Sequence, residues 1–131
     1  MRLVLDTNTC IYALKLQGRV VERLREHSPD EVGVTIVTLA EMWFGAHKRA
    51  RPSVARREID GFLEPFAVLP FDHQAAEAYA RARYELERRG RPIGERDLLI
   101  ASIALARGLT VVTHNVSEFG RVPGLKTEDW L

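Results

Sequence analysis

Cysteine and long apolar stretches are almost absent from this chain of 131 residues, in which Cys10 is the only cysteine. A single cysteine cannot form a disulfide within the chain or build a thiolate metal cluster. No apolar stretch approaches the roughly 20 residues that a membrane-spanning helix needs. Asp6 interrupts the first apolar stretch, so the N-terminus lacks the pattern of a signal peptide. We therefore expect a cytoplasmic protein without a membrane partner.

An excess of charge of either sign is also missing. The chain has 19 basic and 18 acidic residues and a net charge of +1 at pH 7. This balance says little about partners, because local clusters of charge matter more than the sum. The composition, 46% hydrophobic and 28% charged, is ordinary for a globular protein. The length predicts one domain, residues 1–131, with a sizeable core.

Apolar, β-branched stretches alternate with helical patterns along the chain. The stretches predicted to be strands are residues 3–5, 32–37, 66–69 and 109–113, with a short edge strand around 125–127. Apolar residues at helical spacing predict helices over residues 7–15, 20–24, 38–48, 54–64, 73–89 and 98–106. Strands that alternate with helices indicate an α/β fold. We expect a three-layer α/β/α sandwich around a central parallel sheet of four to five strands.

Four acidic residues stand close to the expected strand ends. Asp6 ends the first strand, Glu41 lies one helical turn after the second, Asp97 opens the helix 98–106, and Glu118 follows the fourth strand. In a parallel sheet these positions share the carboxyl edge, where ligands of open α/β sheets bind. Four converging acids without matching bases would raise each other's pKa. A divalent cation resolves this repulsion, and oxygen ligands select Mg²⁺ or Mn²⁺.

Each acid also has a structural interpretation. Asp6 can cap the helix that follows it, and Glu41 can close a capping box with Thr38. Asp97 can interact with a helix dipole, and Glu118 can be a solvated loop acid. Glu41 and Asp97 are embedded among apolar residues, where an acid is costly unless it is paired or bound to metal. This favours a functional interpretation for both of them, whereas Glu118 stays open.

These residues occur in a recognisable order of motifs, and the resemblance covers essentially the whole chain. Leu5-Asp6-Thr7-Asn8, Glu41, Ile93-Gly94-x-x-Asp97-x-x-Ile100-Ala101 and Thr113-His114-Asn115-x-x-Glu118-Phe119 resemble the motifs of PIN-domain ribonucleases, above all the VapC toxins. The resemblance implies a PIN-like fold and a Mg²⁺-dependent endoribonuclease. It also implies a homodimer that a cognate VapB-type antitoxin holds inactive. The catalytic residues would be Asp6, Glu41, Asp97 and Glu118, with the metal held by Asp6, Asp97 and Glu41.

Two departures from the family pattern affect the site. The fourth acidic position of the family often lies two residues after the threonine, which is Asn115 here, so either Asn115 or Glu118 fills that role. Glu95 and Arg96 add a charge pair directly before Asp97. The side chains expected to orient the carboxylates, a water or the substrate are Thr7, Asn8, Thr113 and Asn115. His114 would point away from the site if it continues the strand.

Basic residues form two clusters that suit phosphate contacts along an RNA strand, although any single one is more often a solvated side chain. The expected RNA-binding residues are Lys48, Arg49, Arg51, Arg89, Arg91 and Arg96. Side chains cannot read the deep major groove of an RNA helix, whereas loops offer splayed bases. We therefore expect cleavage in a single-stranded loop of a structured RNA. A tRNA anticodon loop is the first choice, and a ribosomal RNA loop is the second.

Two other classes of function remain open at this point. A phosphoryl-transfer enzyme of the haloacid-dehalogenase type would need a second Asp where Asn8 stands. A response-regulator receiver would carry paired acids after the first strand and a phosphoacceptor after the third, which here ends at Pro70. A non-catalytic partner-binding module on the same fold would have a sheet edge without convergent acids. None of the required acid pairs is present, so the ribonuclease interpretation is favoured.

Overall fold

A parallel sheet of five strands forms the centre of the computed structural model, which describes residues 1–131. Its strands are β1 (Leu3–Leu5), β2 (Val32–Thr35), β3 (Ala67–Leu69), β4 (Thr110–Val112) and β5 (Thr127–Glu128). They lie in the order β3-β2-β1-β4-β5, and every neighbouring pair is parallel. All carboxyl ends of the strands therefore meet at one edge of the sheet.

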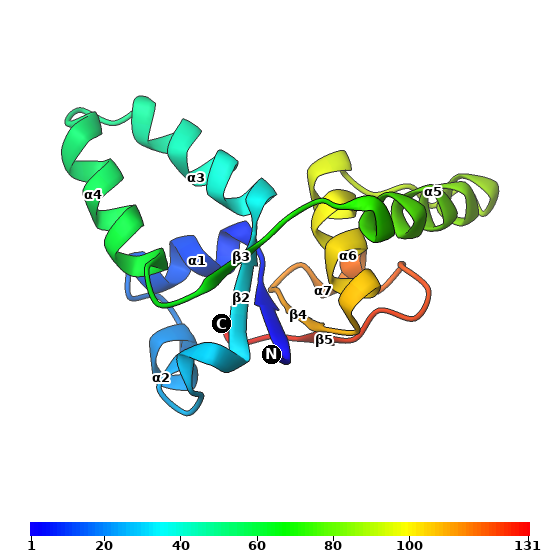
Figure 1. Ribbon diagram of the computed structural model, residues 1–131, viewed down its shortest axis with the longest axis horizontal. Helices are drawn as coiled ribbons and strands as arrows, with labels where there is room; N and C mark the ends of the chain where they lie inside the picture. Colours follow the sequence, from blue (N-terminus) through cyan, green and yellow to red (C-terminus); the bar gives the residue numbers. More distant parts are fainter.

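Helices cover both faces of this sheet. They are α1 (Thr7–Leu14), α2 (Val20–Leu24), α3 (Ile36–His47), α4 (Pro52–Leu63), α5 (His73–Arg88), α6 (Glu95–Arg107) and α7 (Val116–Phe119), with a 3₁₀ turn at Pro29–Glu31. Figure 1 shows α1 to α4 on one side of the strands and α5 to α7 on the other. The expected three-layer α/β/α sandwich is confirmed. None of the helices is both long and apolar enough to cross a membrane.

The core consists of two apolar clusters, one on each face of the sheet. Leu3 and Leu5 pack with residues of α1 to α4, whereas Val4 between them packs with residues of α5 to α7. Successive side chains of a strand point to opposite faces, so a strand that is covered on both sides needs apolar residues throughout. This burial explains why the first strand of the sequence shows no polar alternation.

Most element boundaries differ from those predicted by one or two residues, and α6 begins at Glu95, three residues before the predicted position 98. The second strand ends at Thr35 and α3 begins at Ile36, because the Thr35 hydroxyl accepts a hydrogen bond from the Thr38 amide and caps the helix. Helix α1 ends at Leu14, one residue before the predicted end, and Leu16 lies in the left-handed region at φ 55°. The edge strand β5 lies at Thr127–Glu128 instead of 125–127. Helix α6 ends at Arg107, and its C-cap is Gly108, whose φ of 67° suits glycine.

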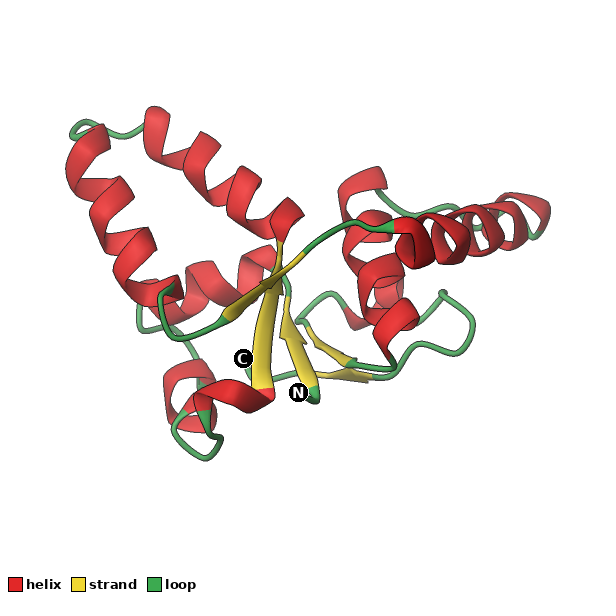
Figure 2. Cartoon of the chain, viewed as in Figure 1, coloured by secondary structure: helices red, strands yellow, loops and turns green.

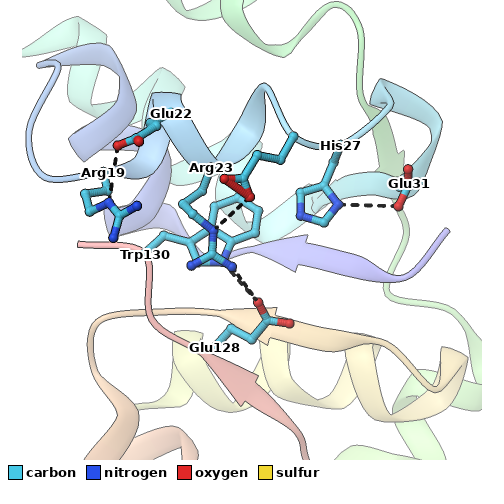
Figure 3. A network of polar contacts seen from close by, with 8 residues as sticks. Arg19, Glu22, Arg23, His27, Glu31, Glu128 and Trp130 are labelled. Atoms are coloured by element: carbon cyan, nitrogen blue, oxygen red, sulfur yellow. Dashed lines mark hydrogen bonds and ion pairs between the residues drawn. The ribbon is translucent and has the colours of Figure 1, made fainter.

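The segment after β5 is anchored against α2 by Trp130. This side chain is buried, stacks on His27 with the ring centroids 5.5 Å apart, and has the Arg23 guanidinium 5.3 Å from its ring. Its indole N–H donates to Glu128 at 3.1 Å. Figure 3 shows these side chains together. Trp130 thus ties β5, the last strand of the sheet, to α2, which comes from the first part of the chain. This contact holds β5 in place beside β4.

The strands β1 and β4 are neighbours, and the connections that follow them lead towards opposite edges of the sheet. From β1 it continues through α1 towards β2, whereas from β4 it continues through α7 towards β5 on the other side. Connections that diverge from neighbouring strands leave a crevice at the carboxyl ends, which is the usual ligand site of open α/β sheets. Asp6 directly follows β1, and Thr113 directly follows β4. The topology thus places both residues at this switch point.

Candidate active site

Asp6 is almost fully buried at the end of β1 and caps α1, because its carboxylate accepts a hydrogen bond of 2.8 Å from the Thr9 amide. Burial raises the pKa of Asp6, and hydrogen bonds from Thr113 and Thr9 oppose this shift. The nearby charge of Glu41 raises the pKa further. Asp6 is therefore both a helix cap and a member of an acidic group, so its role as a cap does not exclude a functional one.

Glu41 lies in the second turn of α3 and faces the same group. Its carboxylate accepts a hydrogen bond of 2.7 Å from the Thr7 hydroxyl, and Arg96 lies 3.5 Å from its other oxygen. The capping-box interpretation of Glu41 is wrong, because Thr35 is the cap of α3 and Thr38 is already inside the helix. Thr7, which the sequence analysis expected to orient a carboxylate, thus contacts Glu41, and its hydroxyl also lies 3.0 Å from that of Thr38.

Asp97 lies in the first turn of α6, and the charges of the three other acids act on its carboxyl group. Burial is the largest cause that raises the pKa of Asp97 to about 6, followed by the charges of Glu118, Asp6 and Glu41. A hydrogen bond from Asn115 opposes the shift. Acids from four separate segments therefore share one electrostatic environment, as expected from their positions at the strand ends.

The Glu118 carboxylate joins two segments of the site by accepting a hydrogen bond from each. One of its oxygens accepts from the Gly94 amide at 2.9 Å, and the other accepts from the Asn115 side chain at 2.6 Å. These two hydrogen bonds hold the pKa of Glu118 below its ordinary value. The Thr113 hydroxyl in turn accepts from the Asn115 amide at 2.9 Å. Asn115 and Glu118 thus work as a pair that joins the loop after β4 to the start of α6.

Two residues of the predicted motifs lie outside the carboxylate group. Asn8 is exposed, and it makes no side-chain hydrogen bond to any of the acids. His114 points away from the site as expected, and its ring lies 2.9 Å from the Asp129 carboxylate. Residues that the sequence analysis missed are Thr9 and Thr35, both buried. Their signal was available, because Asp6 and Thr9, like Thr35 and Thr38, have the spacing of a cap and its partner amide.

Of the predicted RNA-binding residues, only Arg96 contacts a site carboxylate. Lys48 lies over the Phe44 ring, 4.7 Å from its centroid, at the far end of α3, and Arg89 pairs with Glu85 at the far end of α5. Arg49, Arg51 and Arg91 are exposed. Figure 2 shows that α3 and α5 extend away from the strands in different directions. Apart from Arg96, the predicted RNA-binding residues therefore lie towards the ends of two helical arms, and one of them, Arg49, lines a groove that also contains Glu41.

The donor atoms of the group suit a hard divalent cation that keeps part of its water shell. Carboxylate oxygens are the only strong ligands at this edge, and Mg²⁺ is bound in proteins through one or two carboxylates plus waters. No three acidic, histidine or cysteine side chains are arranged to hold an ion directly. The repulsion that raises the pKa of Asp97 is what a bound cation would relieve. The residues present therefore fit an ion that is partly hydrated.

A parallel sheet with acids gathered at its switch point is the architecture of PIN-domain proteins, and the PIN domain model matches residues 3–125 of this chain. The chain is 38% identical over 130 residues to the tRNA(fMet)-specific endonuclease VapC of Salmonella typhimurium, covering 99% of this chain and 98% of that protein. It is 34% identical to Ribonuclease VapC2 of Rickettsia felis, covering 97% and 96% of the two chains.

Solved structures agree with these relatives. A chain of the DNA-bound VapBC complex from Salmonella typhimurium superposes with a TM-score of 0.95 at 39% identity, covering 100% of this chain and 99% of that chain. A chain of VapBC2 from Rickettsia felis, bound to a promoter DNA fragment, gives a TM-score of 0.93 at 34% identity, with both chains fully covered. The chain belongs to the VapC family of PIN-domain ribonucleases, the toxins of VapBC toxin–antitoxin systems.

Membership of this family decides between the functions that the sequence left open. It confirms the resemblance drawn from the four motifs and favours a ribonuclease over a phosphoryl-transfer enzyme of another family. The convergence of Asp6, Glu41, Asp97 and Glu118 also contradicts the sheet edge expected of a non-catalytic module.

Proposed function

We propose that this protein is a Mg²⁺- or Mn²⁺-dependent endoribonuclease that cleaves tRNA and is controlled by a VapB-type antitoxin. One observation carries the proposal: burial and then the charges of three other carboxylates raise the pKa of Asp97 to about 6. Proteins do not gather uncompensated acids at a ligand-binding edge without cost. A divalent cation compensates this charge, and a phosphodiester is a natural ligand for the cation.

Asp6, Asp97 and Glu41 would hold the ion, in part through its bound waters, since no three such side chains are arranged to hold it directly. When bound, the ion stabilises the charge that develops on the phosphodiester oxygens during an in-line displacement. The protein's own residues keep the carboxylates in place: Thr7 donates to Glu41, and Thr113 donates to Asp6. Glu118 fills the fourth catalytic position together with Asn115, by holding the loop after β4 against α6 and not by ligating the ion.

The substrate follows from the relatives and from the shape of RNA. The proteins from Salmonella typhimurium and Shigella flexneri, 38% and 40% identical to this chain, are both named tRNA(fMet)-specific endonucleases. We therefore place initiator tRNA first, with the cut in the anticodon loop, since a loop offers an exposed backbone that a helix does not. A ribosomal RNA loop is the second candidate. Action on tRNA would take place in the cytoplasm.

The antitoxin would bind in the groove between α1, α3 and α4. Ile11, Met42 and Ile59 provide apolar wall, and Glu41 stands in the same lining. A partner segment that packs on this wall therefore reaches a site carboxylate. Arginine pairs with carboxylates through two parallel hydrogen bonds, so an antitoxin arginine beside Glu41 would neutralise the group that otherwise binds the ion. The VapBC complexes with similar chains support such a partner.

Cleavage of purified tRNA tests the proposal. Total tRNA incubated with the protein and Mg²⁺ should yield fragments of one or a few species, cut in the anticodon loop. Their ends should be a 5′-phosphate and a 3′-hydroxyl, because the attack does not involve the neighbouring 2′-hydroxyl. EDTA should stop the reaction, and Asp6→Asn should abolish it while the fold survives, since asparagine also caps helices.

Three results would contradict the proposal. Cyclic phosphate ends would exclude hydrolysis by water, and full cleavage by Asp6→Asn would exclude the assigned metal residues. Degradation of every RNA at similar rates would exclude the proposed specificity. Ser117→Ala, an exposed change in α7, provides a control that should cleave normally.

A further inference from the structure

One ion pair spans the mouth of the candidate site. The Arg96 guanidinium at the start of α6 lies 3.5 Å from the Glu41 carboxylate on α3. The Arg96 side chain is 69% exposed, whereas that of Glu41 is 23% exposed. No other basic side chain lies within ion-pair distance of Asp6, Glu41, Asp97 or Glu118. Arg96 is therefore the one positive charge in direct contact with the carboxylate group.

The neighbourhood explains why Arg96 reaches across to another helix. Arg83 of α5 pairs within its own helix, with Glu87. The acid beside Arg96 is Glu95, but its carboxylate accepts a hydrogen bond of 3.1 Å from the Tyr79 hydroxyl on α5. Arg83 donates to the same hydroxyl at 2.9 Å. Glu95 is thus held towards α5, and Arg96 is left to contact Glu41.

The ion pair between Arg96 and Glu41 cannot persist unchanged when a divalent cation binds to the site. A cation held by Glu41 carries two positive charges and repels a guanidinium a few ångströms away. An exposed ion pair contributes only about 0 to 1 kcal/mol, so it gives way to a stronger competitor. A guanidinium also matches the oxygens of a phosphate in a bidentate fashion. The side chain that leaves Glu41 therefore has a ready second partner in the RNA backbone.

We propose that Arg96 is an exchangeable cation that pairs with Glu41 in the free protein and transfers to a phosphate of the RNA when the metal binds. The inference rests on the proposed function and adds a positioning residue to it. It assigns two opposite effects to one side chain. Arg96 weakens metal binding in the absence of RNA, and it strengthens RNA binding once the metal is present.

Titration with Mn²⁺ alone tests the first effect without any RNA. Calorimetry on Arg96→Gln should show Mn²⁺ binding about three- to tenfold tighter than in the wild type, because a competing positive charge is gone. Arg96→Lys should bind Mn²⁺ as the wild type does, since it keeps the charge. Arg57→Gln, an exposed change on α4, should also leave the affinity unchanged. The gain from Arg96→Gln should shrink in a Glu41→Gln background, where the two changes share one interaction.

Kinetics at saturating Mg²⁺ test the second effect. Arg96→Gln should raise KM for tRNA several-fold and leave kcat within about twofold, and the salt dependence of RNA binding should lose about one phosphate contact. Mn²⁺ affinity that stays equal or falls in Arg96→Gln would overturn the exchange, and an unchanged KM would overturn the phosphate contact. A protein that binds Mn²⁺ as expected but cleaves no RNA would refute the proposed function instead.

Discussion

Asp97 has two conflicting roles. It must stay close to three other acids to take part in a metal site, yet this closeness and its burial raise its pKa to about 6. When the pKa of a carboxyl group is higher in the folded state than in the unfolded state, ionisation of that group lowers the stability of the folded protein. Hydrogen bonds from neutral donors, such as that from Asn115, soften the conflict without removing the negative charge that a cation requires.

We predict that Asp97→Asn abolishes cleavage in the presence of metal and makes the metal-free protein more stable. The folded-state pKa of about 6 lies above the ordinary 3.8, so the wild type loses stability as the pH rises from about 4 to about 6. The full shift would correspond to about 3 kcal/mol, and solvent screening at this half-exposed site reduces it to about 1 kcal/mol. Urea unfolding with EDTA should show this gain at pH 8 and none near pH 4. A gain that does not depend on pH would contradict the electrostatic explanation.

At the scale of elements, the short helix α7 holds the start of the long helix α6. Gly94 is the cap residue of α6 and has no side chain to receive an amide. Its own N–H instead donates to Glu118 of α7, which also accepts from Asn115. Asp97 stands one turn into α6, so the position of its carboxylate depends on a side chain from another helix.

We therefore expect Glu118→Ala to loosen α6 at its first turn. Loss of two hydrogen bonds to a charged acceptor should cost about 1 to 2 kcal/mol of unfolding free energy. Hydrogen exchange of the Gly94 amide should accelerate by about tenfold or more, and tRNA cleavage should slow without being abolished. Ser117→Ala in the same helix is the matched control and should change none of these. Unaltered exchange at Gly94 would show that the start of α6 does not depend on the hydrogen bonds of Glu118.

At the scale of the whole molecule, apolar side chains stay exposed along the edge strand β3. Val68 is 40% exposed, and Phe71 and Ile36 are similarly uncovered. The register pairs Leu69 with Thr35, so these residues lie near one another. Trp43 of α3 is engaged within one chain, where its indole donates to Asp60 and Arg56 covers its ring.

We predict a homodimer that pairs this edge with its own copy across a two-fold axis. Light scattering at micromolar concentration should give about twice the 14.9 kDa of one chain. Val68→Asp should shift the mass towards the monomer, because a charge at the centre of an apolar interface stays unpaired. Leu16→Asp, at an exposed position after α1, should leave the mass unchanged. Monomer alone in the wild type would count against the proposal.

Much of this protein could be predicted from the sequence by itself. The apolar run 3–5 and the alternation with helical patterns determine a parallel sheet, because only a strand covered on both faces lacks polar residues. Asp6, Glu41 and Asp97 could be selected because an acid next to an apolar run needs a partner. Each signal is local, since it depends on residues a few positions apart.

Contacts between distant segments were decided only by the tertiary structure. Thr7 with Glu41, Glu118 with Gly94, and Arg96 with Glu41 join residues 34, 24 and 55 positions apart. No periodicity encodes such pairs, because they follow from the strand order and from which partner each side chain already has. Arg96 is the clearest case. Its neighbour Glu95 accepts a hydrogen bond from Tyr79 of α5. Arg96 pairs instead with Glu41, on a helix that covers the other face of the sheet.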